Sequence, residues 1–173
     1  IRAAVVTVSD KGAQGLREDL SGPEVARILK DHRIEVATVI IVPDEEETIS
    51  ATLRELADRQ RFDLVVTTGG TGVTPRDVTP EATRAVLDRE IPGMGEAMRQ
   101  ASMAVTPHAM ISRALAGIRG QTLIVNLPGS PKGARENLAT VMPAIPHAIA
   151  KIKGSDTECA GDMGNTTTRN PIP

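Results

Sequence analysis

A glycine-rich segment contains the residues best suited to binding an anion. Residues 67–72 read Thr-Thr-Gly-Gly-Thr-Gly and end a run of apolar residues. Glycines let backbone N–H groups converge on a negatively charged oxygen, and a threonine hydroxyl adds a donor. The segment lacks the Lys-Ser/Thr ending of a P-loop and the glycine spacing of a dinucleotide fingerprint. It predicts a phosphate cradle, with a tight turn as the alternative, formed by Gly69, Gly70, Thr71 and Gly72.

Asp77 could join a phosphate group through a divalent cation, and Asp44 is a second acidic candidate. Asp77 follows Arg76 just beyond the glycines, and a carboxylate beside a phosphate cradle is repelled unless a cation lies between them. Mg²⁺ binds one or two carboxylates together with phosphate oxygens. A local pair with Arg76 or a second helix cap is the alternative for Asp77. Asp44 begins the acidic run 44–47 and is a weaker catalytic candidate, because acidic residues also favour the first turn of a helix.

Residues 126–133, Asn-Leu-Pro-Gly-Ser-Pro-Lys-Gly, form a second candidate binding loop. Two prolines stiffen it, two glycines keep it open, and Lys132 offers a point charge for phosphate. The Gly-x-Ser-x-Gly pattern of a nucleophile elbow is absent. A plain strand-to-helix turn is the alternative. The three histidines lack ligand spacing and Cys159 has no base nearby, so neither zinc nor thiol chemistry is predicted.

The segments around these loops alternate between strand and helix patterns. Short apolar runs rich in β-branched residues predict strands over 1–8, 36–42, 62–68 and 121–127. The continuous apolar run of the second strand predicts that both its faces are covered, as in parallel sheets. This alternation is typical of an α/β fold with a mostly parallel sheet. Ligands bind beyond the carboxyl ends of such strands, so we expect the site in the loops after Val8, Val42, Thr68 and Leu127.

Local signals predict where helices begin and end. Ser21, followed three residues later by a glutamate, predicts a capping box. Thr79 is predicted to cap another helix, in which Ala82, Ala85 and Val86 face inward. Extended pieces are predicted over 111–116. Residues 134–153 are predicted to be helical, with breaks at two prolines.

The near-absence of aromatic residues excludes several classes of protein. The 173 residues include no Trp, no Tyr and one Phe, while apolar residues make up 40%. Single-strand nucleic-acid modules, immunoglobulin-like sandwiches and membrane barrels all depend on aromatic side chains. The net charge of −2, without a basic block, argues against duplex DNA or an anionic membrane as a partner. We therefore expect neither nucleic acid nor a membrane to be bound.

Length, composition and local patterns predict the domain organisation and the compartment. A chain of this size and apolar content predicts one domain over residues 1–153. Periodicity ends at Gly154, so residues 154–173 are predicted to be a flexible tail. The single cysteine, the absence of a signal-peptide pattern at Ile1 and the lack of a spanning apolar stretch predict a cytoplasmic location.

Four longer strings resemble the molybdopterin-binding MogA/MoaB family, to which the gephyrin G domain is related. They are TTGGTGVTPRDVTPEAT, EIPGMGEAMR, ISRALAGIRG and LIVNLPGSPKG, supported by the shorter TVSD and DLSGP. The resemblance covers roughly residues 3–153 and implies a three-layer α/β sandwich that forms a homo-oligomer, most often a trimer. It also implies that ATP and molybdopterin are converted, with Mg²⁺, to adenylyl-molybdopterin and pyrophosphate. A molybdenum-insertion protein would act downstream.

The resemblance implies roles for individual residues. Asp44 and Asp77 match two aspartates associated with catalysis, and either would ligate Mg²⁺. Ser112 and Asn126 match residues on the pterin side. The remaining residues expected to bind substrate are Ser9, Asp10, Gly69, Gly70, Thr71, Gly72, Arg113, Pro128, Gly129, Ser130 and Lys132.

Three other functions stay open at this point: a non-catalytic molybdopterin-binding homologue, a domain of a molybdenum-insertion enzyme and, more distantly, an NAD-binding protein. Whether a trimer or a hexamer forms is also open. Phe62 is predicted at the end of the sheet away from the loops. The rings of the substrates are therefore expected to pack on aliphatic side chains, backbone and the two prolines Pro128 and Pro131.

Overall fold

A computed structural model describes residues 1–155, so the predicted tail beyond Ser155, with Cys159, lies outside the described residues. The middle layer is a six-stranded sheet in the order β2-β1-β3-β6-β5-β4. The first four strands in this order are parallel to one another, β5 is antiparallel to β6, and β4 is antiparallel to β5. The predicted α/β fold with a mostly parallel sheet is thus confirmed. The strands are β1 (Arg2–Val8), β2 (Glu35–Val42), β3 (Leu64–Thr68), β4 (Arg89–Glu90), β5 (Ala116–Arg119) and β6 (Thr122–Leu127).

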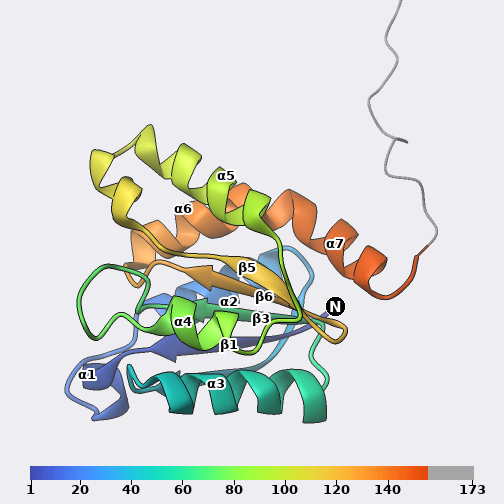
Figure 1. The fold of residues 1–173 in the computed structure, drawn as a ribbon, viewed down its shortest axis with the longest axis horizontal. Coiled ribbons are helices and arrows are strands. Elements are labelled where there is room, and N and C mark those ends of the chain that lie inside the picture. The colour runs from blue at the N-terminus through green and yellow to red at the C-terminus, as the bar shows by residue number, and fades with distance from the viewer. Residues whose placement is uncertain (156–173) are drawn as a thin grey trace, which may run out of the picture.

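Helices cover both faces of the sheet, which makes three layers (Figure 1). One face packs against α2 (Ser21–Asp31), α5 (Pro92–Met103), α6 (Pro131–Val141) and α7 (Ile145–Ile152). The other face packs against α3 (Glu46–Arg54), its π-helical extension η1 (Glu55–Arg59) and α4 (Thr79–Arg84). Short helices complete the described chain: α1 (Asp10–Ala13), η2 (Pro107–Ile111) and η3 (Met142–Ala144).

Alternation along the central strands divides the core between the two faces. In β1, Ala3 and Val5 belong to the core under α2 and α6, whereas Ala4 and Val6 belong to the core under α3 and α4. Successive residues of a strand point to opposite faces, so a strand covered twice must be apolar at every position. Phe62 is buried just before β3, at the end of the sheet away from the strand-end loops, as predicted.

The register of the parallel strands brings four loops to one edge of the sheet. Val8 lies beside Val42, Thr7 beside Thr68, and Thr68 beside Leu127. The chain leaves β1 toward β2 on one side and returns to β3 on the other. In open α/β sheets, ligands bind where the strand order reverses in this way. The fold therefore places the predicted binding loops around the ends of β1 and β3.

Strand β2 differs from its prediction. It is an edge strand, and Val39 and Ile41 are 42% and 39% exposed. The prediction of two covered faces was wrong because β-branched residues also favour a strand that is covered on one face only.

Two predicted helix caps are replaced by other contacts. Ser21 lies inside the first turn of α2, and the Asp19 carboxylate accepts hydrogen bonds from the Ser21 N–H (3.1 Å) and the next N–H (3.0 Å). Thr79 also lies inside its helix, and its hydroxyl donates to the Gly69 carbonyl at 2.9 Å. Aspartate accepts as readily as serine, so sequence alone did not distinguish the two caps.

Some predictions for later parts of the chain also differ from the structure. Residues 107–111 form the 3₁₀ helix η2, and the strand predicted within 111–116 begins only at Ala116. Ala85, just beyond the end of α4 at Arg84, is exposed, whereas Ala82 and Val86 are buried as predicted. The predicted helical stretch is α6 and α7, interrupted at η3, while Pro146 lies in the first turn of α7, where its missing N–H has no helical partner to lose. No helix within residues 1–155 is long and apolar enough to cross a bilayer.

Candidate functional site

The glycine segment forms a close backbone junction at the ends of β1, β3 and β6. Gly69 and Gly70 adopt positive φ angles of 110° and 63°. A Cβ on Gly69 would collide with the Val8 carbonyl oxygen, and one on Gly70 would collide with the Thr79 hydroxyl. Gly129 approaches so closely that its Cβ would lie 3.1 Å from Gly69 Cα. The tight turn considered as an alternative is therefore present, and its glycines bring three loops into contact.

The same turn leaves donors open to a ligand. The Gly69 N–H donates to the Leu127 carbonyl at 3.1 Å. The next three N–H groups, of Gly70, Thr71 and Gly72, donate to no acceptor within residues 1–155. A contact with the loop after β6 holds the turn in place: the Thr68 hydroxyl donates to the Pro128 carbonyl at 2.7 Å. Consecutive free N–H groups in a rigid turn are a geometry that binds anionic oxygens.

Asp44 reaches this turn from the end of β2. Its Oδ2 accepts from the Asp10 N–H at 2.8 Å, and its own N–H donates to Asp10 Oδ1 at 2.9 Å. Asp44 Oδ1 lies 3.1 Å from where a Cβ on Gly70 would stand. Because α3 begins at Glu46, Asp44 lies outside the first turn of that helix. The first-turn alternative for this residue is therefore wrong.

The surroundings of Asp44 disfavour the ionised form of its carboxyl. Burial raises the pKa of the Asp44 carboxyl, and the negative charges of Asp10 and Asp77 raise it further, against the lowering effect of the hydrogen bond from the Asp10 N–H. Arg76 donates to both oxygens of Asp10, at 2.9 and 2.8 Å, and thereby lowers the pKa of that carboxyl. Arg76 therefore pairs with Asp10 and not with its neighbour Asp77.

Asp77 closes a short turn and faces the glycine segment. Its Oδ2 accepts from the Thr74 N–H at 2.8 Å and lies 2.8 Å from where a Cβ on Gly72 would stand. Within residues 1–155, no group of three or more His, Cys, Asp or Glu side chains is arranged to hold a metal ion. Asp44 and Asp77 alone could hold a cation only if a ligand completed its coordination.

Two clefts flank the glycine segment. The first has a volume of about 420 Å³ and lies toward the loop before α2, where Ser9 and Asp44 line it. The second has a volume of about 410 Å³ and lies toward α5 and η2, where Thr71, Gly72 and Ser112 line it together with Pro128. The residues that line both clefts are Gly70, Asp77, Gly129 and Ser130. The clefts therefore meet at the turn and at one of the two aspartates.

Several predicted site residues line neither cleft. The Arg113 Nε–H donates to the Gly72 carbonyl at 2.6 Å, and the guanidinium also contacts Glu81 and the Asp77 carbonyl. Arg113 therefore stabilises the glycine turn through its backbone carbonyls. Asn126 is fully buried under the sheet edge, where its Nδ2 donates to the Thr67 and Thr83 hydroxyls at 2.9 and 3.0 Å. The structure thus gives both side chains protein partners near the turn.

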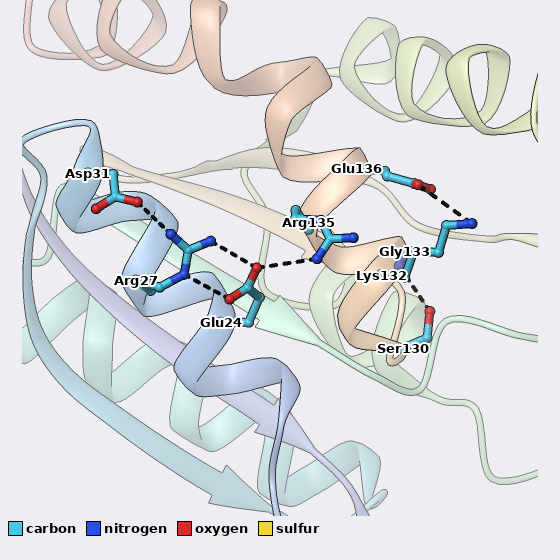
Figure 2. A network of polar contacts seen from close by, with 8 residues as sticks. All are labelled: Glu24, Arg27, Asp31, Ser130, Lys132, Gly133, Arg135 and Glu136. Atoms are coloured by element: carbon cyan, nitrogen blue, oxygen red, sulfur yellow. Dashed lines mark hydrogen bonds and ion pairs between the residues drawn. The ribbon is translucent and has the colours of Figure 1, made fainter.

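Lys132 lies along the outer surface of α6, and Ser130 starts that helix (Figure 2). The Lys132 Nζ is 3.9 Å from a carboxylate oxygen of Glu136, whereas Ser130 Oγ accepts from the Gly133 N–H at 3.1 Å. Further along, Arg135 reaches Glu24 of α2 at 3.6 Å. These contacts tie α6 to α2 and fix the end of the 126–133 loop.

Sequence reasoning missed several residues that line the clefts. Asp19 and Leu20 line the first cleft, and Arg99, Ser102 and His108 line the second. The string Asp-Leu-Ser-Gly-Pro pointed toward Asp19. The string EIPGMGEAMR ends at Arg99 but assigned it no role, and no pattern marked Ser102, because the roles of both depend on how the end of α5 packs over the loop after β6.

Comparison with known proteins identifies relatives across the whole described domain. A family described as "Probable molybdopterin binding domain" matches residues 4–147. The molybdopterin adenylyltransferase of Helicobacter pylori strain 26695 is 44% identical, covering 90% of this chain and 89% of the relative. The crystal structure of the molybdopterin biosynthesis enzyme MoaB from Thermus thermophilus is 52% identical, with a TM-score of 0.84, and covers 88% of this chain and 96% of the other.

A longer relative is the gephyrin of Dictyostelium discoideum. It is 49% identical over 86% of this chain, but the chain spans only 22% of that protein. What gephyrin does as a whole is therefore not carried over to this chain.

Proposed function

The chain belongs to the MogA/MoaB family of molybdopterin-binding proteins, and from this premise we propose that it transfers AMP from ATP to molybdopterin. The products are adenylyl-molybdopterin and pyrophosphate. One observation carries the proposal: two clefts of similar volume meet at a turn with free N–H groups and at Asp77. A transfer between two substrates requires their reacting groups to be held together in this way.

We assign ATP to the first cleft and molybdopterin to the second. Ser112, which matches a pterin-side residue of the family, lines only the second of these two clefts, together with Thr71. The first cleft is bordered by Ser9, Asp44 and the loop before α2. With this assignment the phosphate of molybdopterin and the phosphates of ATP meet at the glycine turn.

The reaction forms one P–O bond and breaks another. A terminal phosphate oxygen of molybdopterin attacks the α-phosphorus of ATP, and the bond from that phosphorus to the oxygen bridging the β-phosphorus breaks, so pyrophosphate leaves. The free N–H groups of Gly70, Thr71 and Gly72 hold phosphate oxygens. Such transfers depend on positioning and charge neutralisation rather than on a covalent protein intermediate.

Mg²⁺ fits the two aspartates. Both carboxylates face the glycine turn, and the pKa of Asp44 is raised by burial and, to a smaller extent, by the negative charges of Asp10 and Asp77. Mg²⁺ prefers one or two carboxylates plus phosphate oxygens, which is the donor set available here. Asp44 and Asp77 would hold the ion, and when bound it would neutralise the phosphate charges that approach each other.

We also propose a homotrimer, a cytoplasmic location and delivery of the product to a molybdenum-insertion protein. The family resemblance supports these proposals. The exposed edge of β2, with Val39 and Ile41, and the exposed Met110 and Ile111 of η2 offer apolar surface for a second copy. The mass of the purified protein by light scattering tests the trimer.

The activity is tested by incubating the protein with ATP, molybdopterin and MgCl₂ and measuring adenylyl-molybdopterin and pyrophosphate. We expect transfer that depends on Mg²⁺ and is abolished by EDTA. Asp44→Ala and Asp77→Ala should each lower the rate by about 100-fold or more while molybdopterin still binds. Asp31→Ala, an exposed residue of α2, serves as the control.

Two results would contradict different parts of this proposal. Tight molybdopterin binding by the unaltered protein without AMP transfer would favour the non-catalytic homologue. Parallel loss of pterin binding and transfer in both aspartate variants would contradict the catalytic roles of Asp44 and Asp77.

A further inference from the structure

An arginine without an acidic partner lies in the wall of the second cleft. Arg99 is half-buried near the end of α5, and its Nη1 donates to the Ala114 carbonyl at 2.8 Å and to the Ser112 carbonyl at 3.4 Å. Within residues 1–155 no carboxylate lies within ion-pair distance of it, and its Nε and Nη2 donate to no protein acceptor. Both acceptors are neutral backbone carbonyls, so they do not neutralise the positive charge of the guanidinium.

The protein makes room for this guanidinium. Gly95 lies one helical turn before Arg99, and a Cβ there would lie 3.2 Å from Arg99 Nη2 and 2.9 Å from the Ala114 carbonyl oxygen. A larger residue at position 95 would therefore push the guanidinium away from the carbonyls that hold it. The glycine thus allows α5 to approach the segment 112–114 with the arginine between them.

Arg99 is the only lysine or arginine among the described residues that line the second cleft. The other charged or titratable side chains lining it are Asp77, His108 and Glu136. With no carboxylate of the described residues beside it, this permanent cation is available to pair with an anionic group of a ligand in the cleft. A guanidinium with free N–H donors binds anionic oxygen or sulfur through charge-assisted hydrogen bonds.

We infer that Arg99 binds an anionic group of the pterin substrate and so determines the affinity of the second cleft. This inference rests on the proposed function for the identity of the ligand. Molybdopterin has two anionic groups, its phosphate and its ene-dithiolate, and both can accept from a guanidinium. Arg99 also lines a neighbouring hollow with Glu90 and Pro92, and no residue of that hollow lines the first cleft. Arg99 therefore meets the pterin substrate and not ATP.

The test separates the charge of Arg99 from its bracing of residues 112–114. Arg99→Gln keeps an N–H donor for the Ala114 carbonyl but removes the charge, and Arg99→Met removes both. Arg84→Met is the matched control, because Arg84 lines the neighbouring hollow and is paired with Glu90 at 2.6 Å. Thermal melting of all variants shows which of them keep the fold.

Three ligands are titrated against each protein without ATP: molybdopterin, a pterin that carries the phosphate but no dithiolene, and a neutral pterin. For molybdopterin, both Arg99 variants should raise Kd about 10- to 100-fold, with binding of neutral pterin unchanged. The KM for ATP should stay within about twofold. The phosphate-only ligand identifies the contacted group: weakened binding assigns Arg99 to the phosphate, and unchanged binding assigns it to the dithiolate.

Two results would overturn the inference. One is an unchanged Kd for molybdopterin in a folded Arg99→Gln protein. The other is an equal loss of affinity for neutral pterin and molybdopterin, which would mean that Arg99 only shapes the cleft. These titrations do not need AMP transfer, so absence of transfer in the unaltered protein would refute the proposed function and leave the role of Arg99 to the binding data.

Discussion

Asp10 and Asp44 hold each other by reciprocal hydrogen bonds, in which each carboxylate accepts from the backbone N–H of the other residue, at 2.8 and 2.9 Å. Arg76 completes the arrangement by binding both oxygens of Asp10. The pair joins the loop after β1 to the loop after β2. It also leaves Asp44 Oδ1 directed toward the glycine turn. Asp10 is therefore a positioning residue for Asp44.

Removing the Asp10 carboxylate should slow AMP transfer without weakening pterin binding. Asp10→Ala removes the acceptor of the Asp44 N–H and of Arg76, so the Asp44 backbone is held less firmly, although the Asp44 carboxylate still accepts from the N–H of residue 10. We expect kcat to fall about 10- to 100-fold, since small misplacements in an active site have effects of this size. Asp10→Asn keeps an acceptor for the Asp44 N–H and should lose less. A normal kcat in Asp10→Ala would show that the pair does not position Asp44.

Replacing Asp44 by asparagine should stabilise the fold at neutral pH while abolishing activity. Burial and nearby negative charges raise the pKa of Asp44, so its ionised form is disfavoured in the folded state. This penalty is present above the folded-state pKa and disappears as the pH falls through that pKa toward the unfolded value. Asp44→Asn should therefore raise Tm by about 1–3 °C at pH 7.5, with the gain shrinking toward pH 4. The control is Asp31→Asn, and a lower Tm at pH 7.5 for Asp44→Asn would contradict the prediction.

The crowding around Gly70 can be separated from its backbone conformation by a matched pair of variants. Gly70 and Gly15 have similar φ angles, 63° and 71°, but a Cβ meets the Thr79 hydroxyl and Asp44 at Gly70 and nothing within 4 Å at Gly15. Gly15→Ala should cost about 1 kcal/mol from backbone strain alone. Gly70→Ala should cost about 2–4 kcal/mol and also weaken substrate binding. Equal losses of unfolding free energy would show that crowding at Gly70 is unimportant.

In the first cleft, to which we assign ATP, the adenine should pack on an aliphatic side chain, because no described residue that lines this cleft is aromatic. Leu20 is 57% exposed and lines the first cleft, whereas Leu16, in the same loop, is 74% exposed and lines neither cleft. If the adenine packs on Leu20, Leu20→Ala should raise the KM for ATP about fivefold through lost apolar contact. Leu16→Ala should leave it unchanged. The same KM in both variants would place the adenine elsewhere.

Much of the fold was predictable because the strands are short apolar runs between clear turn signals. Residues 64–68 and 122–127 form strands as predicted, and the structure places both in the centre of the sheet, where a strand covered twice must be apolar throughout. The burial of β2 was not predictable, because an edge strand can carry the same β-branched residues. Nor was the capping of α2 by Asp19, because the sequence contains a serine that could equally cap the helix.

For the site, the sequence by itself determined which residue types are available: three glycines in a turn, two aspartates after strands and a stiff loop after β6. Local spacing is enough for these, because turn conformation and strand ends depend on nearby residues. Only the tertiary structure decided which of them share a cleft. The register of β2, β1, β3 and β6 brings the glycine turn to Asp44 and Gly129, and the same packing turns Arg113, Asn126 and Lys132 toward protein partners. Arg99 ends the string EIPGMGEAMR, but its place in the second cleft depends on the packing of α5 against residues 112–114, a contact between distant segments that no local pattern in the sequence encodes.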